Sequence, residues 1–215
     1  MAKLYFRYSV MNSGKSLNLI AAVHSMRSKG IVVEVMKPTL DTRSTDICSR
    51  AISTTLTPTP IHSSSNIFQL ISDMETKPSW IYVDEAQFLS AAQVDQLARI
   101  ADDLDISVIC YGLRTDFRTH LFEGSKRLFE IADTFEELKT SCSCGRKAAV
   151  NARIGSDGQI ITEGAQIDCG AEDKYTTMCR KCFMEKIGKS DKWEKYERKI
   201  GSKMTCFLFL FGCIW

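Results

Sequence analysis

Residues 9–16 (SVMNSGKS) carry the residue types that a phosphate-binding loop requires. Such a loop wraps backbone N–H groups around phosphate oxygens, which demands small residues such as Gly14. Lys15 can neutralise the charge of the β- and γ-phosphates, and the Ser16 hydroxyl can coordinate Mg²⁺. A helix that starts at the loop would direct the positive end of its dipole at the same phosphates. The segment therefore predicts a Walker A loop, against the alternative of an ordinary strand–turn–helix that happens to spell SGKS.

Ser9 departs from the loop pattern, which has glycine as its first residue. Serine is small, but it resists the positive φ angles that glycine adopts freely. We therefore expect Ser9 to be the loop residue on which activity most depends.

Asp84 and Glu85 form a second candidate site, because they follow the apolar residues 80–83 (WIYV). In P-loop enzymes an aspartate here holds Mg²⁺, directly or through water, and the next acid can act as a base. Asp41 could add to the metal shell, and Arg43 could stabilise charge on a transferred phosphoryl group. On the residues alone, a solvated acidic loop and a surface Asp–Arg pair remain the alternatives.

Four of the nine cysteines cluster as Cys142-x-Cys144 and Cys179-x-x-Cys182, separated by 34 residues. Four thiolates in two pairs suit tetrahedral Zn²⁺, and with no fifth ligand apparent the site would be structural. Zinc would pin both ends of the intervening segment and give it a fixed shape without a large core. Free thiols are the alternative.

Apolar periodicity predicts strands that alternate with helices along the first half of the chain. The expected strands span 4–8, 31–36, 80–83 and 106–111, and the expected helices span 17–27, 66–74 and 91–104. This alternation predicts an α/β fold, with a parallel sheet flanked by helices. Ser9, Asp84 and Gly112 each follow a strand, so we expect them at the carboxyl edge of the sheet, where ligands bind.

We expect the chain to divide into a P-loop kinase core at 1–140, a zinc and substrate-covering domain at 141–190, and a charged, then apolar, C-terminal tail at 191–215. As a helix, residues 206–215 (CFLFLFGCIW) would span about 15 Å, too short for a bilayer that needs roughly 20 residues. We therefore expect no membrane span.

The composition is typical of a soluble protein, with 44% hydrophobic and 25% charged residues. A net charge of only +2 gives no global basic field to attract nucleic acid or membranes. The N-terminus lacks the pattern of a secretory signal, so we expect a cytoplasmic, reducing environment in which clustered cysteines bind metal.

Six motifs occur in the order and at the spacings of the type II thymidine kinases, a family of cellular cytosolic, bacterial and poxvirus enzymes. They are SVMNSGKS, KPTLDTR, YVDEAQFL, GLRTDF, CSCGRKA and DKYTTMCRKC. The chain resembles this family from about residue 3 to residue 192. The resemblance implies a RecA-like P-loop core, a small zinc-ribbon-like domain with a lasso loop, and usually a homotetramer. It implies transfer of the γ-phosphate of ATP to the 5′-hydroxyl of deoxythymidine, with Mg²⁺ and structural Zn²⁺.

The resemblance also implies roles for individual residues. Glu85 would accept the 5′-hydroxyl proton, and Asp41 and Arg43 would flank the sugar and the reacting phosphate. The nucleotide and its metal would be bound by Ser9, Val10, Met11, Asn12, Ser13, Gly14, Lys15, Ser16, Asp84 and Gln87. The apolar wall around the thymine would consist of Met11, Phe88, Leu113, Phe117 and Phe122.

The lasso loop before Tyr175, which includes Gly170, would hydrogen-bond the base through its backbone, and Tyr175 would pack over the base. Residues 168–172 (DCGAE) depart from the apolar residue and Gly-Gly pair that the family usually has there.

Two other hypotheses remain open. A RecA-like ATPase that depends on nucleic acid would bind it through a basic, aromatic-rich face near the cysteines. Residues 141–172 offer only Arg146, Lys147 and Arg153, with no aromatic residue. An inactive relative of the kinases is the other hypothesis, and it rests on Ser9 and the altered lasso.

Overall fold

The computed structural model describes residues 1–40, 46–49, 52–166 and 174–188. Its core is a six-stranded sheet with the strand order β5-β2-β6-β7-β1-β8. All neighbouring strands in this sheet are parallel. The strands are β1 (Leu4–Ser9), β2 (Val33–Pro38), β5 (Thr59–Ile61), β6 (Trp80–Val83), β7 (Ser107–Leu113) and β8 (Thr134–Glu137). The predicted parallel α/β fold is therefore confirmed.

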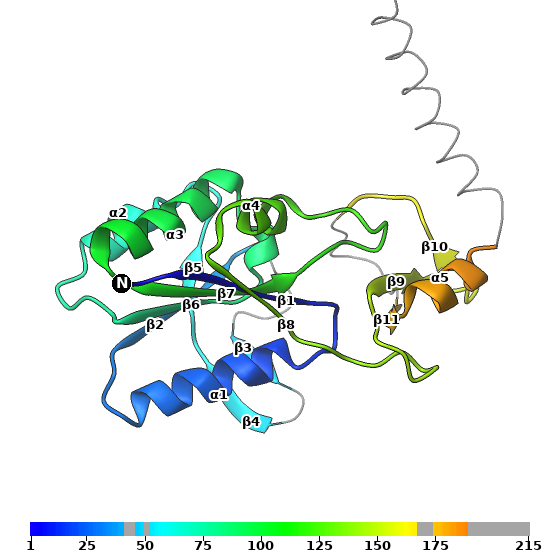
Figure 1. Ribbon diagram of the computed structural model, residues 1–215, viewed down its shortest axis with the longest axis horizontal. Helices are drawn as coiled ribbons and strands as arrows, with labels where there is room; N and C mark the ends of the chain where they lie inside the picture. The colour runs from blue at the N-terminus through cyan, green and yellow to red at the C-terminus, as the bar shows by residue number, and fades with distance from the viewer. Residues whose placement is uncertain (41–45, 50–51, 167–173, 189–215) are drawn as a thin grey trace, which may run out of the picture.

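Helices cover both faces of the sheet, as Figure 1 shows. One face carries α1 (Lys15–Arg27), and the other carries α2 (Ile67–Ser72), α3 (Ala91–Leu104) and α4 (Glu123–Ile131). Successive strand residues point to opposite faces, so each strand supplies two apolar layers. Ile81 of β6 packs in the layer with α3, whereas the next residue, Tyr82, packs in the layer with α1.

The boundaries predicted for β6 and α3 match the structure, but the strand predicted at residues 31–36 begins two residues later. The reason is the end of α1. Gly30 takes a left-handed conformation with φ 73°, and the N–H of Ile31 bonds back to the carbonyl of Met26 at 3.1 Å. This C-terminal turn uses Ile31 and leaves Val32 49% exposed. The hairpin of β3 (Ile47–Ser49) and β4 (Ile52–Leu56) was not predicted.

A small module follows the main sheet along the chain. Its three antiparallel strands are β9 (Val150–Ile154), β10 (Ile160–Ile161) and β11 (Lys174–Met178), in the order β10-β9-β11, followed by α5 (Arg180–Lys186). The module lies beyond the edge of the main sheet where β1 meets α1 (Figure 1). Its apolar core contains Cys142, Val150 and Phe183, and also Val10 of the phosphate loop.

The predicted domain limits at 140 and 190 stay predictions, and the tail at 191–215 lies outside the described residues. Within the described ranges, no helix is long and apolar enough to cross a bilayer.

Candidate active site

The phosphate loop joins β1 to α1 at the carboxyl edge of the main sheet (Figure 1). Two of its residues have a left-handed backbone, Asn12 with φ 53° and Gly14 with φ 80°. Gly14 precedes α1, and no side chain in the described part of the chain caps this helix. The first N–H groups of α1 are thus available to a ligand, which is how helix N-termini bind phosphate.

The backbone strain expected at Ser9 is absent, so that prediction is wrong in its physical basis. Ser9 is the last residue of β1 and is not among the described residues with positive φ. Asn12 and Gly14 take the left-handed conformations instead. The buried Ser9 hydroxyl accepts a hydrogen bond from the Ser13 hydroxyl at 2.6 Å and donates one to the carbonyl of Val10 at 2.9 Å. Serine is therefore compatible with this position, and its hydroxyl links the start of the loop to Ser13.

Lys15 is the first residue of α1, directly after the phosphate loop. Its side chain is largely buried, and its Nζ donates to the carbonyl of Val10 at 3.1 Å. A bound phosphate could replace this contact, because a charged oxygen is a better acceptor for an ammonium group than a neutral carbonyl.

Asp84 and Glu85 stand at the end of β6, between the phosphate loop and β2. Asp84 is buried, and its burial, followed by the negative charge of Glu85, raises its pKa to about 7. The charges of Lys15 and Lys37 lower that pKa in part. A divalent cation would favour the ionised carboxylate of Asp84 and so offset the cost of burying its charge beside Glu85. The acidic pair therefore fits a magnesium site.

The backbone of Glu85 is strained, with φ 50° and ψ 36°. A left-handed conformation is uncommon for a residue other than glycine and often marks a functional site. The N–H of Glu85 donates to the Asp84 carboxylate at 3.0 Å, and the turn continues into the short helix η1 (Ala86–Phe88). The Asp84 carboxylate therefore stabilises the turn from which the Glu85 side chain extends.

The side chain of Gln87 contacts the Glu85 carboxylate. Its Nε2 donates to Glu85 Oε2 at 2.5 Å, and its Oε1 accepts the N–H of Leu113 at 2.9 Å. Gln87 is 1% exposed, and a side chain at Gly112 would come within 3.0 Å of its Oε1. Gly112 near the end of β7 therefore leaves the space that the Gln87 side chain occupies. The predicted contact of Gln87 with a nucleotide stays a prediction.

The predicted apolar wall lies around the ends of β7 and η1. The rings of Phe88 and Phe122 meet edge to face, with centroids 5.7 Å apart. Leu113 ends β7 beside Gln87, and Phe117 is almost fully buried. The Arg153 guanidinium lies 5.3 Å from the centre of the Phe117 ring.

The structure also describes Met11, the remaining residue of the predicted wall, and Tyr175, which was predicted to pack over the base. Met11 contacts the small module, and Tyr175 belongs to it. Met11 donates its N–H to the side chain of Asn151 on β9, and Tyr175 of β11 pairs with Arg153 of β9. Three predicted site residues, Asp41, Arg43 and Gly170, lie outside the described residues.

Asp116 is a buried carboxylate near the predicted apolar wall that the sequence motifs did not single out. It is 3% exposed and accepts the N–H groups of Arg118 and His120, each at 2.9 Å, and the side-chain amide of Gln166 at 3.1 Å. Arg118 also pairs with Asp116 at 3.0 Å and donates to the carbonyl of Gly164 at 3.0 Å. These contacts join the loop after β7 to the segment that precedes the predicted lasso. The motif GLRTDF contains Asp116, but nothing in its spacing shows how many donors converge there.

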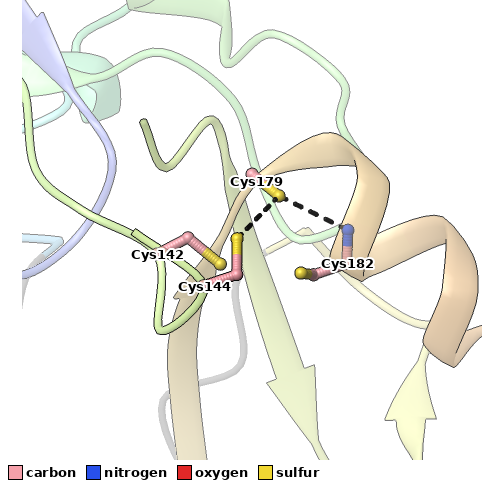
Figure 2. A group of neighbouring side chains, drawn as sticks. All are labelled: Cys142, Cys144, Cys179 and Cys182. Carbon is pink, nitrogen blue, oxygen red and sulfur yellow. Dashed lines mark hydrogen bonds between the residues drawn. The ribbon is translucent and has the colours of Figure 1, made fainter. Parts of the chain in front are cut away.

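The four cysteines predicted to bind zinc come together, as Figure 2 shows. Their sulfur atoms all lie within 4.8 Å of one another, with 3.6 Å between Cys144 Sγ and Cys179 Sγ. Four sulfurs around a tetrahedral zinc lie about 3.8 Å apart, given zinc–sulfur bonds of about 2.3 Å. Cys182 also donates its N–H to Cys179 Sγ at 3.4 Å, as expected for a thiolate ligand. The cluster therefore fits a closed structural zinc site.

The pKa values of the cysteines show why a metal suits this cluster. Backbone N–H groups of Cys144 and Cys179 lower the pKa of Cys142 to about 6, whereas hydrogen bonds with the neighbouring thiols raise the pKa of Cys182 to about 12. Four sulfurs this close cannot all be anionic without a cation. Zinc would supply that charge and hold all four as thiolates.

The sequence of this chain is similar to known proteins of one family. The chain matches the thymidine kinase family over residues 2–183. It is 45% identical to a thymidine kinase of Rhodopirellula baltica over 192 residues, which cover 87% of this chain and 90% of the relative. It is 44% identical to a thymidine kinase of Haemophilus influenzae over 191 residues, covering 87% of this chain and 99% of the relative. This chain belongs to the thymidine kinase family.

Proposed function

We propose that this protein transfers the γ-phosphate of ATP to the 5′-hydroxyl of thymidine and so produces dTMP for DNA synthesis by pyrimidine salvage. The observation that carries the proposal is the placement of Glu85. Its carboxylate accepts the side-chain N–H of Gln87 directly after β6, at the same carboxyl edge of the sheet as the phosphate loop. Relatives that match nearly the whole chain are thymidine kinases, which supports this function over a nucleic-acid-dependent ATPase.

In the proposed reaction, Glu85 accepts the proton of the 5′-hydroxyl as that oxygen attacks the γ-phosphorus. The bond between this phosphorus and the β,γ-bridging oxygen breaks, and ADP leaves. The loop N–H groups and Lys15 bind the phosphates. Mg²⁺ held by Ser16 and Asp84 would neutralise charge on the β- and γ-phosphates. Arg43 would stabilise the transferred group, and Asp41 would lie near the sugar.

Thymine would lie against Met11, Phe88, Leu113, Phe117 and Phe122, with Tyr175 over it and the lasso around Gly170 bonding its edge. The wall would supply apolar contact for the 5-methyl group, and the lasso backbone would supply hydrogen bonds that fit a pyrimidine. The zinc site would fix both ends of the segment that carries the lasso. We further propose a cytoplasmic homotetramer, on the basis of the family resemblance.

The proposal is tested by incubating the purified protein with labelled thymidine, ATP and Mg²⁺. We expect labelled dTMP that disappears when ATP or Mg²⁺ is omitted. No dTMP above that of a Glu85→Gln control would contradict the proposal. ATP hydrolysis that needs DNA but not thymidine would favour the ATPase hypothesis.

Replacing Gln87 with leucine should lower kcat roughly 10–100-fold, because a misplaced catalytic group loses much of the advantage of orientation. The Km for thymidine should change little. Steady-state kinetics with both substrates checks this. Gln87→Glu is the matched variant, since it keeps the length of the side chain but places a second charge beside Glu85. Equal loss of kcat and of thermal stability in both variants, with raised Km values, would indicate a structural role alone.

Replacing Ser9 with glycine should leave kcat/KM for ATP within about fivefold of the original protein, because Ser9 needs no positive φ and its hydroxyl bonds lie within the loop. Thermal unfolding should show a loss of about 1–2 kcal/mol from the missing hydrogen bonds. An increase of a hundredfold or more in kcat/KM would show instead that serine impairs this enzyme, as the hypothesis of an inactive relative requires.

A further inference from the structure

Asn151 on β9 joins the small module to both loops of the active site. Its Oδ1 accepts the N–H of Met11 in the phosphate loop at 2.7 Å, and its Nδ2 donates to the carbonyl of Thr115 in the loop after β7 at 3.0 Å. The residue is 2% exposed. Buried amides with both ends bonded to backbone are costly to disturb, because each lost bond leaves a polar group without a partner.

The strand that carries Asn151 packs with the segments that carry the cysteine cluster. β9 pairs with β11, which places Asn151 opposite Thr177 and Val150 opposite Met178, the residue before Cys179. Val150 and Ala152, the neighbours of Asn151, pack in the same apolar core as Cys142 and Cys179. The strand that carries Asn151 is therefore held by the segment that carries two of the four thiols.

The phosphate loop contacts the module at two successive residues. Val10 is 6% exposed and packs in the apolar core of the module, and Met11 bonds to Asn151. The next residue, Asn12, has a left-handed backbone, so the turn of the phosphate loop begins directly after these two contacts. Arg114 adds a further link, because its Nη2 donates to the carbonyl of Ala149 at 2.9 Å.

We infer that Asn151 is a positioning residue through which the small module, with its cysteine cluster, holds the phosphate loop in the conformation that binds the nucleotide. The module thus supports the ATP site as well as the nucleoside site, although no cysteine lies in the phosphate loop. The inference rests on the proposed function for the identity of the nucleotide. It differs from a role of the module as a cover for the nucleoside alone, which would leave nucleotide binding unaffected.

The test is calorimetric binding of the non-hydrolysable ATP analogue AMP-PNP, with Mg²⁺ and without thymidine. Asn151→Leu should weaken binding about tenfold, because the Met11 N–H loses its acceptor. Asn151→Asp keeps that acceptor but turns an oxygen toward the Thr115 carbonyl, and should weaken binding about threefold. Thr177→Val, on the paired strand, should bind as the original protein does.

Zinc content and thermal unfolding, measured on the same samples, separate local from global effects. Unchanged affinity in zinc-loaded, folded Asn151→Leu protein would overturn the inference. If this variant does not fold, Asn151→Asp decides, and unchanged affinity there would overturn it equally. Binding is measured without catalysis, so the inference can fail while thymidine phosphorylation stands, and the reverse also holds.

Discussion

Replacing Glu85 with glutamine is expected to lower kcat for thymidine phosphorylation by about 10²–10⁴-fold, the usual contribution of a general base. Glutamine has nearly the same shape and can still accept the hydrogen bond from Gln87 Nε2, so the left-handed turn should persist. It cannot take the proton of the 5′-hydroxyl. Steady-state kinetics should therefore show a loss in kcat, with Km values for both substrates close to those of the original protein.

Glu85→Asp is the matched control, because it keeps the carboxylate but withdraws it by one methylene. We expect its kcat to lie between those of the original protein and of Glu85→Gln. If kcat of the Glu85→Gln variant lies within tenfold of that of the original protein, Glu85 is not the base. This conclusion would hold whatever the variant does to substrate binding.

Replacing Cys179 with serine is expected to abolish zinc binding and to reduce kinase activity more than a hundredfold, because metal binding and folding of such small modules are one process. Cys179 is buried and precedes α5, where its sulfur accepts the Cys182 N–H. Serine is itself a favourable residue at a helix start. The loss would therefore reflect the missing thiolate and not a missing helix cap.

Metal analysis of the freshly prepared, unchelated protein checks this prediction, with about one zinc expected per chain. The matched control is Cys48→Ser, which alters an exposed cysteine on β3, outside the cluster. It should retain zinc and activity. Well under one zinc per chain in the original protein would refute the zinc site.

The elements that position the phosphates and the base could be predicted because their signals are local. Residues 80–83 are apolar and end in two carboxylates, and β6 has these bounds in the structure. The helix predicted at 91–104 has these bounds in the structure, and Ser90, which precedes it, forms a capping box with Gln93. The phosphate loop, the acidic pair and the cysteine cluster each follow a short motif. The spacing within each motif reflects the geometry of a single ligand, which is phosphate, Mg²⁺ or Zn²⁺.

Other features of the site depend on contacts between distant segments, which one sequence does not display. Asn151 reaches Met11 across 140 residues of chain, and Asp116 receives the Gln166 amide across 50. The conformation of Ser9 depends on a similar contact, since Ser9 pairs with Leu113 as a strand residue and the left-handed conformations of the loop lie at Asn12 and Gly14.

The most direct test of the central claim is to follow the label from ATP that carries ³²P on its γ-phosphate, in the presence of thymidine and Mg²⁺. The account predicts that the original protein places the label on the 5′-oxygen of dTMP, and that Glu85→Gln protein binds both substrates but transfers at least a hundredfold more slowly. Label that appears only as inorganic phosphate, or transfer at equal rates by both proteins, would contradict it.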